Sequence, residues 1–84
     1  MSKVQREKRY VPVVVRFDTE GQIRPLEIEF DESHIYPVDR VLDVCRAACQ
    51  TVGGVGIRYT VRVQGHERYL WLEENKWFVE ALRT

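Results

Sequence analysis

The last third of the chain alternates apolar and polar residues in short stretches that are separated by turn residues. Residues 57–63 alternate along their whole length, which is the period-two pattern of a strand with one dry and one wet face. Residues 64–67 supply a turn, with a glycine where a positive φ is needed. Residues 68–73 form a second such stretch, and residues 77–80 a third after the turn at 74–76. The pattern predicts three consecutive antiparallel strands.

The register of these strands follows from parity. If each hairpin loop has an even number of residues, odd positions of one strand face even positions of the next, whichever even length is chosen. One face then collects a core of Ile57, Tyr59, Val61, Val63, Leu70, Leu72, Trp77 and Val79, with Arg68 at its edge. The opposite face collects Arg58, Thr60, Arg62, Glu67, Tyr69, Trp71, Glu73, Lys76, Phe78 and Glu80. An odd-length loop would reverse the faces of one strand.

The second face combines aromatic side chains with arginines, although the core does not need them there. Either another part of this chain covers the aromatic residues, as in a closing barrel or under a docking helix, or the face binds a partner. Trp, Tyr and Arg are over-represented at interface hot spots. The candidate partner-binding residues are Tyr69, Trp71, Phe78, Arg58 and Arg62.

A second hairpin is expected nearer the start of the chain. Residues 10–17 are rich in β-branched side chains, and Pro12, which cannot donate to a ladder, suggests an edge. After a turn at residues 18–21, apolar and acidic residues alternate over 23–30. Pro25 interrupts this strand and predicts a bulge or an exposed edge.

Length and composition indicate one small domain. The chain has 84 residues, of which 44% are hydrophobic, so it is large enough to fold alone. Residues 1–9 are polar and mostly basic and are expected to form a flexible N-terminal arm. Residues 10–84 are expected to form a single β-barrel domain.

The stretch at residues 37–50 is ambiguous. Its apolar residues recur with helical spacing, and Pro37 suits the first turn of a helix. Read as a strand, the same stretch has apolar groups on both sides. Periodicity alone favours a helix over the residues Val38, Val41, Leu42, Cys45, Ala48 and Cys49.

A resemblance favours a strand instead. The runs 35–43, 53–59, 69–72 and 77–79 resemble a family of small uncharacterised bacterial proteins, in which an aromatic-x-hydrophobic strand runs into Val-Leu-Asp and a Trp strand ends the domain. The resemblance implies an SH3-like β-barrel, with a strand from about residue 36 to residue 45. Some members are encoded beside Y-family translesion DNA polymerases, which implies a role near DNA repair. No catalytic or binding residues carry over from this family.

The expected fold is therefore mainly β, a single small antiparallel SH3-like barrel of five to six strands. The alternative is an α+β fold with one helix at about residues 37–50. The formal net charge is zero, with thirteen basic and thirteen acidic residues, so no global field attracts nucleic acid or an anionic membrane. No apolar run approaches the ~20 residues of a membrane span, and the polar start has no signal-peptide character. A cytoplasmic protein is expected.

Catalytic and metal chemistry find little support. Cys45 and Cys49 are expected to be reduced, buried thiols, and together with His34 and His66 they match no zinc spacing. Ser33 beside His34 lacks any recognisable nucleophile framework. The glycine cluster at 53–56 precedes a strand, whereas phosphate-binding loops follow one. No enzyme activity, metal or cofactor is expected.

These observations favour a protein-interaction module with an unidentified protein partner. The alternative is a single-stranded nucleic-acid binder that stacks bases on its aromatic residues and holds phosphates with arginines. The interspersed glutamates argue against the alternative. A monomer is expected, because Pro12 and Pro25 look like protection of open strand edges.

Overall fold

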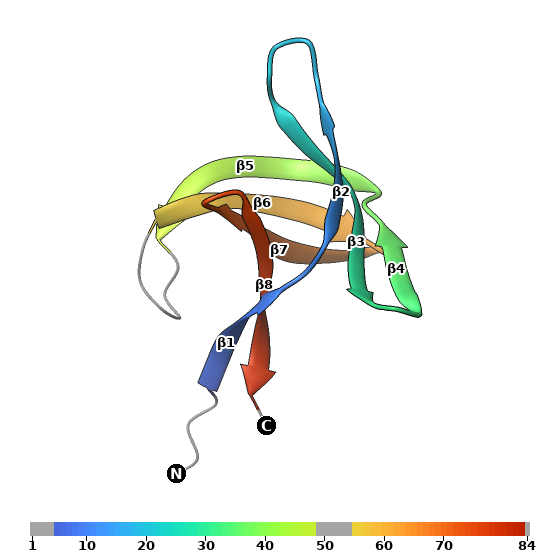
Figure 1. Ribbon diagram of the computed structural model, residues 1–84, viewed down its shortest axis with the longest axis vertical. Helices are drawn as coiled ribbons and strands as arrows, with labels where there is room; N and C mark the ends of the chain where they lie inside the picture. Colours follow the sequence, from blue (N-terminus) through green and yellow to red (C-terminus); the bar gives the residue numbers. More distant parts are fainter. Residues whose placement is uncertain (1–4, 49–54, 84) are drawn as a thin grey trace.

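The computed structural model describes residues 5–48 and 55–83. These residues form eight β-strands in two antiparallel sheets and contain no helix (Figure 1). The mainly β fold is confirmed. The helical alternative is wrong for residues 37–48, while residues 49 and 50 lie outside the described part of the chain. Nothing in the described ranges is a helix that could cross a membrane.

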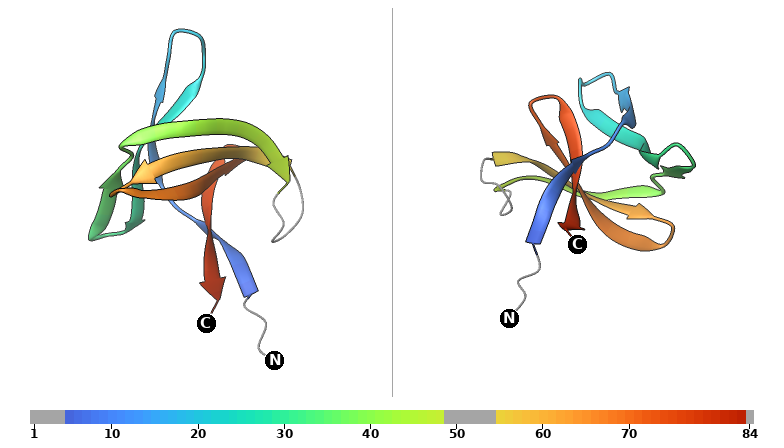
Figure 2. Two further views of the ribbon diagram at one scale, coloured as in Figure 1. Left: turned by 180° about the vertical axis from the view of Figure 1, so that it is seen from behind. Right: turned by 60° about the horizontal axis from the view of Figure 1, so that its bottom comes forward.

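The two sheets share the strands unequally. The five-stranded sheet has the order β1 (Gln5–Tyr10), β8 (Lys76–Arg83), β7 (His66–Glu73), β6 (Val55–Val63), β5 (Arg40–Ala48). The three-stranded sheet has the order β2 (Val13–Phe17), β3 (Ile23–Asp31), β4 (His34–Pro37). The β2–β3 hairpin projects beyond the larger sheet, and the start of β1 and the end of β8 lie at the opposite end of the molecule (Figures 1 and 2).

Two bends join the sheets into a barrel-like arrangement. β1 runs into β2 through Val11 and Pro12, and β4 runs into β5 through Val38 and Asp39. The N–H of Val11 donates to the carbonyl of Trp77 at 3.0 Å, and the N–H of Asp39 donates to that of Arg62 at 2.8 Å. If each bent pair counts as one strand, six strands pair in sequence order and the first pairs with the last, as in an up-and-down barrel. This count agrees with the expected five to six strands.

The register predicted for the C-terminal strands is confirmed. Tyr59 pairs with Leu70, and Leu72 pairs with Trp77. Both loops have two residues, Gln64–Gly65 and Glu74–Asn75, and all four of these residues have positive φ. Even loop lengths therefore keep the two predicted faces apart, and the shorter loops lengthen each strand.

The main core lies between the two sheets. Tyr59 also ties them together, because its hydroxyl donates to the carbonyl of Ile23 at 3.0 Å. Ile57, expected in this core, is instead 36% exposed, because it lies near the far end of β6 beside Arg46 of β5. The buried residues of the core are Val11, Ile28, Tyr59, Val61, Val63, Leu70 and Leu72.

The N-terminal arm is a correction to the sequence analysis. Residues 5–9 are not a flexible arm but part of β1, which pairs along its whole length with β8; residues 1–4 lie outside the described ranges. Lys8 places its Nζ 2.7 Å from Oε1 of Glu73. Two charged residues of this polar strand find partners beyond β8, Lys8 on β7 and Arg9 at the carbonyl of Phe30 on β3, which periodicity within the segment could not reveal.

The prolines also differ from expectation. Pro12 lies in the bend between β1 and β2 rather than in an edge strand. Pro25 is buried in β3, the central strand of its sheet, and lies beside a break in the register with β2. Of the bulge and the exposed edge that were expected at Pro25, the bulge is therefore confirmed. The strand expected from residue 36 to residue 45 is broken by the bend at Val38 and Asp39 into the end of β4 and the start of β5.

Candidate functional site

Two of the predicted partner-binding residues are covered by this chain. Trp71 is 3% exposed and Phe78 is 0% exposed. Their rings stack at 6.0 Å between centroids, with planes 4° from parallel, and Ala47 packs against the pair. Tyr10 meets Phe78 edge-on at 5.8 Å, and the Nζ of Lys8 lies 4.7 Å from the Phe78 centroid. Of the two explanations for this face, coverage by the chain itself applies to Trp71 and Phe78.

The other three predicted residues stay together nearer the surface. Tyr69 is 53% exposed, and the guanidinium of the half-buried Arg58 lies 4.5 Å from its ring centroid. Arg62 is exposed, with Nη2 3.9 Å from Oε1 of Glu67. The register places these three residues, together with Glu67, on the outer face of the β6–β7 hairpin. This group is the accessible remainder of the predicted site.

Tyr69 lies beside a gap in the sheet. β8 pairs with β7 only from Lys76 to Phe78 and with β1 from Phe78 to Arg83, so from Val79 onward β1 is its one registered neighbour among the described strands. The two strands therefore part after Phe78, as the diverging ribbons of β7 and β8 show (Figure 2). Residues 66–70 of β7 are paired with β6 on one side, and no strand within residues 5–48 and 55–83 is in register with them on the other.

The backbone of β7 presents hydrogen-bonding groups to this gap. Val63 and His66 flank a two-residue turn and so form a hydrogen-bonded pair. Hydrogen-bonded and non-hydrogen-bonded pairs alternate along antiparallel strands. The N–H and C=O groups of Glu67 and Tyr69 consequently point away from β6, into the space that β8 has left.

A cleft of about 690 Å³ lies at this gap, between the ends of β7 and β8 and the β3–β4 hairpin. Arg68 pairs with Val61 and Arg9 pairs with Val79, so both arginines are on the inner face of the sheet, on either side of the gap. The aromatic and aliphatic lining is Ile28, Phe30, Tyr36, Val61, Val63, Tyr69, Leu70, Val79 and Ala81, and Glu67 and Glu80 line the cleft from the outer face. The ionisable residues that line it from the inner face or the hairpin are Arg9, Asp31, His34, His66 and Arg68.

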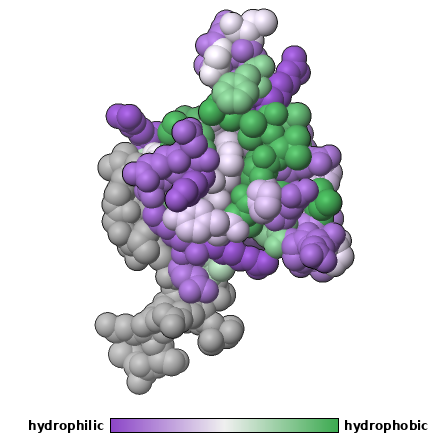
Figure 3. Space-filling model, in the orientation of Figure 1, coloured by the Kyte–Doolittle hydropathy of each residue, from purple (hydrophilic) through white to green (hydrophobic). Residues whose placement is uncertain are grey.

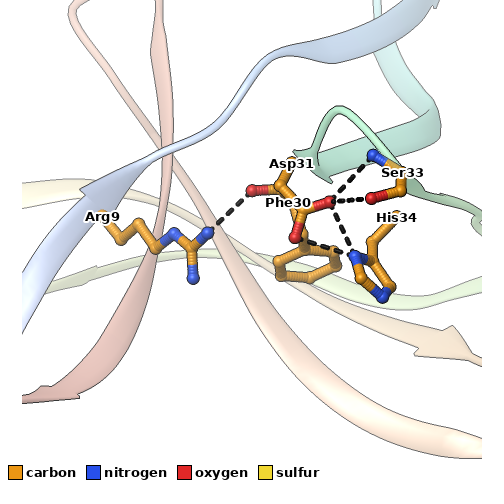
Figure 4. A network of polar contacts seen from close by, with 5 residues as sticks. All are labelled: Arg9, Phe30, Asp31, Ser33 and His34. Atoms are coloured by element: carbon orange, nitrogen blue, oxygen red, sulfur yellow. Dashed lines mark hydrogen bonds and ion pairs between the residues drawn. The ribbon is translucent and has the colours of Figure 1, made fainter.

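Arg9 joins β1 to the hairpin at the mouth of the cleft (Figure 4). Its Nη2 donates to the carbonyl of Phe30 at 2.7 Å. The remaining N–H groups of a guanidinium can still bind an acceptor, because the group carries five donors. On the inner face, Arg9 and Arg68 therefore border the gap, and the apolar residues that line the cleft form its floor.

Asp31 organises the β3–β4 turn. Its Oδ1 accepts from the Ser33 N–H at 2.9 Å and from the Ser33 hydroxyl at 3.3 Å. His34 Nδ1 lies 2.6 and 2.8 Å from the two carboxylate oxygens. The hydrogen bond from His34, followed by that from the Ser33 backbone, lowers the pKa of Asp31 below its usual 3.8. Ser33 bonds to the carboxylate rather than to the imidazole, so the group orders a turn and does not form a Ser–His nucleophile pair.

Of the two cysteines, the described part of the chain contains Cys45, which is a free thiol. Cys45 is half-buried on β5, opposite Arg58, and Cys49 lies outside the described ranges. Within residues 5–48 and 55–83, no three His, Cys, Asp or Glu side chains are grouped to hold a metal ion.

Sequence reasoning did not find the cleft. Alternation continues through Val79 and Glu80 as if β8 stayed beside β7, so the point at which the strands part leaves no mark in the pattern. Comparison with family models, with curated proteins and with solved structures finds no match to this chain.

Proposed function

We propose that this domain is a protein-interaction module that binds an extended segment of a partner protein at the open edge of β7. The observation that carries the proposal is the parting of β8 from β7, which leaves the backbone groups of Glu67 and Tyr69 facing a cleft. An extended peptide can add to such an edge as a further strand, so that main-chain hydrogen bonds give affinity and alternate side chains give specificity.

The two faces of the gap define the peptide. Side chains on its inner face would meet the apolar floor and the guanidinium groups of Arg9 and Arg68, which suit an aspartate or glutamate. Side chains on its outer face would meet Tyr69, whose exposed ring is steadied by Arg58. The ligand is therefore an extended segment of about five residues, matching the open length of β7, with an acidic side chain facing inward.

The resemblance to proteins encoded beside Y-family polymerases makes such a polymerase, or another repair factor, the first partner to test. Exposed termini and loops of a partner that combine acidic and apolar residues are the segments to synthesise as peptides. Selection from a random-peptide phage library against the full chain provides candidates without assuming the partner.

Matched substitutions at one position test the binding mode. Tyr69→Ala removes the ring and keeps the backbone N–H, whereas Tyr69→Pro removes both, at a position whose N–H has no role in the β6–β7 ladder. Selected peptides should bind the Ala variant more weakly and the Pro variant not at all, and they should shift the amide NMR signals of Glu67 and Tyr69. Selected peptides that bind the Pro variant as well as the original chain would sink the proposal.

Single-stranded nucleic acid is a second candidate, because Arg9, Arg68 and His66 line the cleft, although Asp31, Glu67 and Glu80 line it as well. Against it stand the buried state of Trp71 and Phe78, which leaves Tyr69 as the exposed member of the three aromatic residues. Fluorescence anisotropy with a labelled oligonucleotide at two salt concentrations separates the two functions. Tight binding that weakens steeply with salt would favour nucleic acid over the peptide.

A further inference from the structure

β2 has an open edge that no other described strand pairs with. Its register is with β3 alone, from Val13 to Phe17. β8, the neighbour of β1, begins only at Lys76, and the last bond along this side runs from the Val11 N–H to Trp77. Beyond Val11, the β2–β3 hairpin leaves the larger sheet and projects outward (Figure 1).

The hydrogen bonds at both ends of β2 show which backbone groups face outward. The Glu29 N–H donates to the carbonyl of Pro12, and the Asp18 N–H donates to that of Gln22, each at 3.0 Å. Even-numbered residues of β2 thus point their backbone groups at β3. Since the direction alternates along the strand, the N–H and C=O groups of Val13, Val15 and Phe17 point away from it.

This edge also carries exposed apolar side chains. Phe17 is 68% exposed, the highest value among the exposed large hydrophobic side chains of the described residues, and Val14 is 46% exposed. Figure 3 shows hydrophobic residues gathered over β2 and β3. Natural edge strands are usually blunted by a proline, a lysine or another charge.

The other edge strands carry such devices. The Val38 N–H donates to the carbonyl of Leu26, so on β4 the backbone of Pro37 faces outward, where a strand would have to add. β1 carries Lys8 and Arg9, and β5 carries charged residues along its length. β2 has Arg16 as its one charged residue, and neither Pro12 nor Pro25 lies within it.

We propose that β2 pairs antiparallel with β2 of a second copy of this chain, about a two-fold axis at Val15, and so forms a homodimer. The outward-facing positions are symmetric about Val15, as a two-fold interface requires. Val15 would pair with Val15 of the second copy, and Val13 with its Phe17, each pair exchanging both backbone hydrogen bonds.

The side chains fit the same pairing. The inner face would carry one apolar row across the joined sheet, Ile28 and Val13 of one copy followed by Phe17 and Ile23 of the other. On the outer face Arg16 would lie opposite Val14 of the second copy, so no like charges are opposed. The most exposed ring of the edge is covered by this arrangement. A hetero-partner would need to supply the same complement from an unrelated sequence, whereas the second copy supplies it by symmetry.

The test is the oligomeric state of the full chain by sedimentation equilibrium, from micromolar to millimolar concentration. The unmodified chain should show a monomer–dimer equilibrium. Val15→Pro removes an outward N–H without removing a bond to β3, and it should sediment as a monomer throughout. Ile35→Pro is the matched control, because Ile35 of β4 also points its N–H outward, and this variant should still dimerise.

A second variant covers the chance that proline at position 15 impairs folding. Phe17→Ser changes an exposed side chain and should raise the dimer dissociation constant at least about tenfold while the monomer stays folded by circular dichroism. An unmodified chain that is monomeric at millimolar concentration overturns the proposal. A dimer that survives both Val15→Pro and Phe17→Ser overturns it as well.

Discussion

The indole of Trp71 lies parallel to the ring of Phe78, 6.0 Å away, on the face of the sheet opposite the main core. The two rings form a small second core, closed from the side of β1 by Tyr10 and Lys8. Each side of the larger sheet therefore buries apolar surface, and Trp71 and Phe78 stabilise the fold instead of being accessible to a partner.

Trp71→Ala should destabilise the fold by about 3–5 kcal/mol, the usual cost of truncating a buried aromatic residue. A domain of this size has a total stability of only ~5 kcal/mol, so much of the variant should be unfolded. Trp71→Phe should cost less, because the buried Nε1 of Trp71 has no hydrogen-bond partner to lose among the described residues. Urea unfolding measures both, with Tyr69→Ala as the exposed control, expected within about 1 kcal/mol of the original chain. A fully stable Trp71→Ala variant would show that the second core contributes nothing.

Tyr59→Phe should lower the free energy of unfolding by about 1 kcal/mol, because it removes the bond from the Tyr59 hydroxyl to the Ile23 carbonyl. Burial raises the pKa of Tyr59 above its usual 10.0. As pH rises, the phenol of Tyr59 ionises in the unfolded chain before it ionises in the folded one. Its contribution to the free energy of unfolding is therefore complete below pH 10 and is lost as pH rises through the higher folded pKa. Unfolding curves from about pH 8 to pH 11 should show that the free energy of unfolding of the original chain falls toward that of Tyr59→Phe. A difference in free energy of unfolding that grows with pH would contradict this direction.

The Lys8–Glu73 pair should contribute a coupling energy of about 1 kcal/mol, at the upper end for surface pairs, because its two side chains are 15% and 23% exposed and 2.7 Å apart. A double-mutant cycle with Lys8→Met and Glu73→Gln measures it. Arg62 and Glu67 are the control pair, at 3.9 Å with side chains 46% and 63% exposed, and their coupling should be close to zero. Equal coupling for the two pairs would show that closure of β1 onto the sheet does not depend on Lys8.

Gly65→Ala should cost about 1–2 kcal/mol through its backbone alone. The residue has φ of 78°, and no atom of the described residues lies within 4 Å of the position a Cβ would take. Gly65→Asn should recover part of the loss, because asparagine tolerates left-handed backbone. Thermal unfolding compares the two variants. Equal stability of Gly65→Ala and the original chain would mean that the turn changes its conformation.

Asp31 should titrate below 3.8 in the folded chain, and His34→Gln should move its pKa back toward that value, because His34 is the main cause of the shift. The bond to the Ser33 N–H remains in the variant, so the return should be incomplete. Since the folded pKa is depressed, the linked stability is present above the unfolded pKa and is lost as pH falls through the folded one. NMR titration of the side-chain carboxyl measures both values. An Asp31 pKa unchanged by His34→Gln would assign the shift to the turn backbone instead.

Much of the C-terminal architecture was predictable from the sequence. Alternation along residues 57–63 and 68–73, with even loops between strands, determined which residues share a face, and Tyr59 pairs with Leu70 as that parity requires. Two-residue turns with positive φ are local features, which is why residues close in sequence sufficed. Periodicity suggested a helix at residues 37–50, and this interpretation is wrong for the described residues 37–48. Pairing of β5 with β6 outweighs the local pattern there.

By itself, then, the sequence determined the faces of each strand, because side-chain direction along a strand is a local, period-two property. Only the tertiary structure decided which faces are covered. Phe78 is buried because β1, more than sixty residues away in sequence, returns to β8, and Tyr69 is exposed because β8 parts from β7 beside it. Both outcomes depend on strands that meet across the fold, and such long-range contacts leave no periodic signal in either segment.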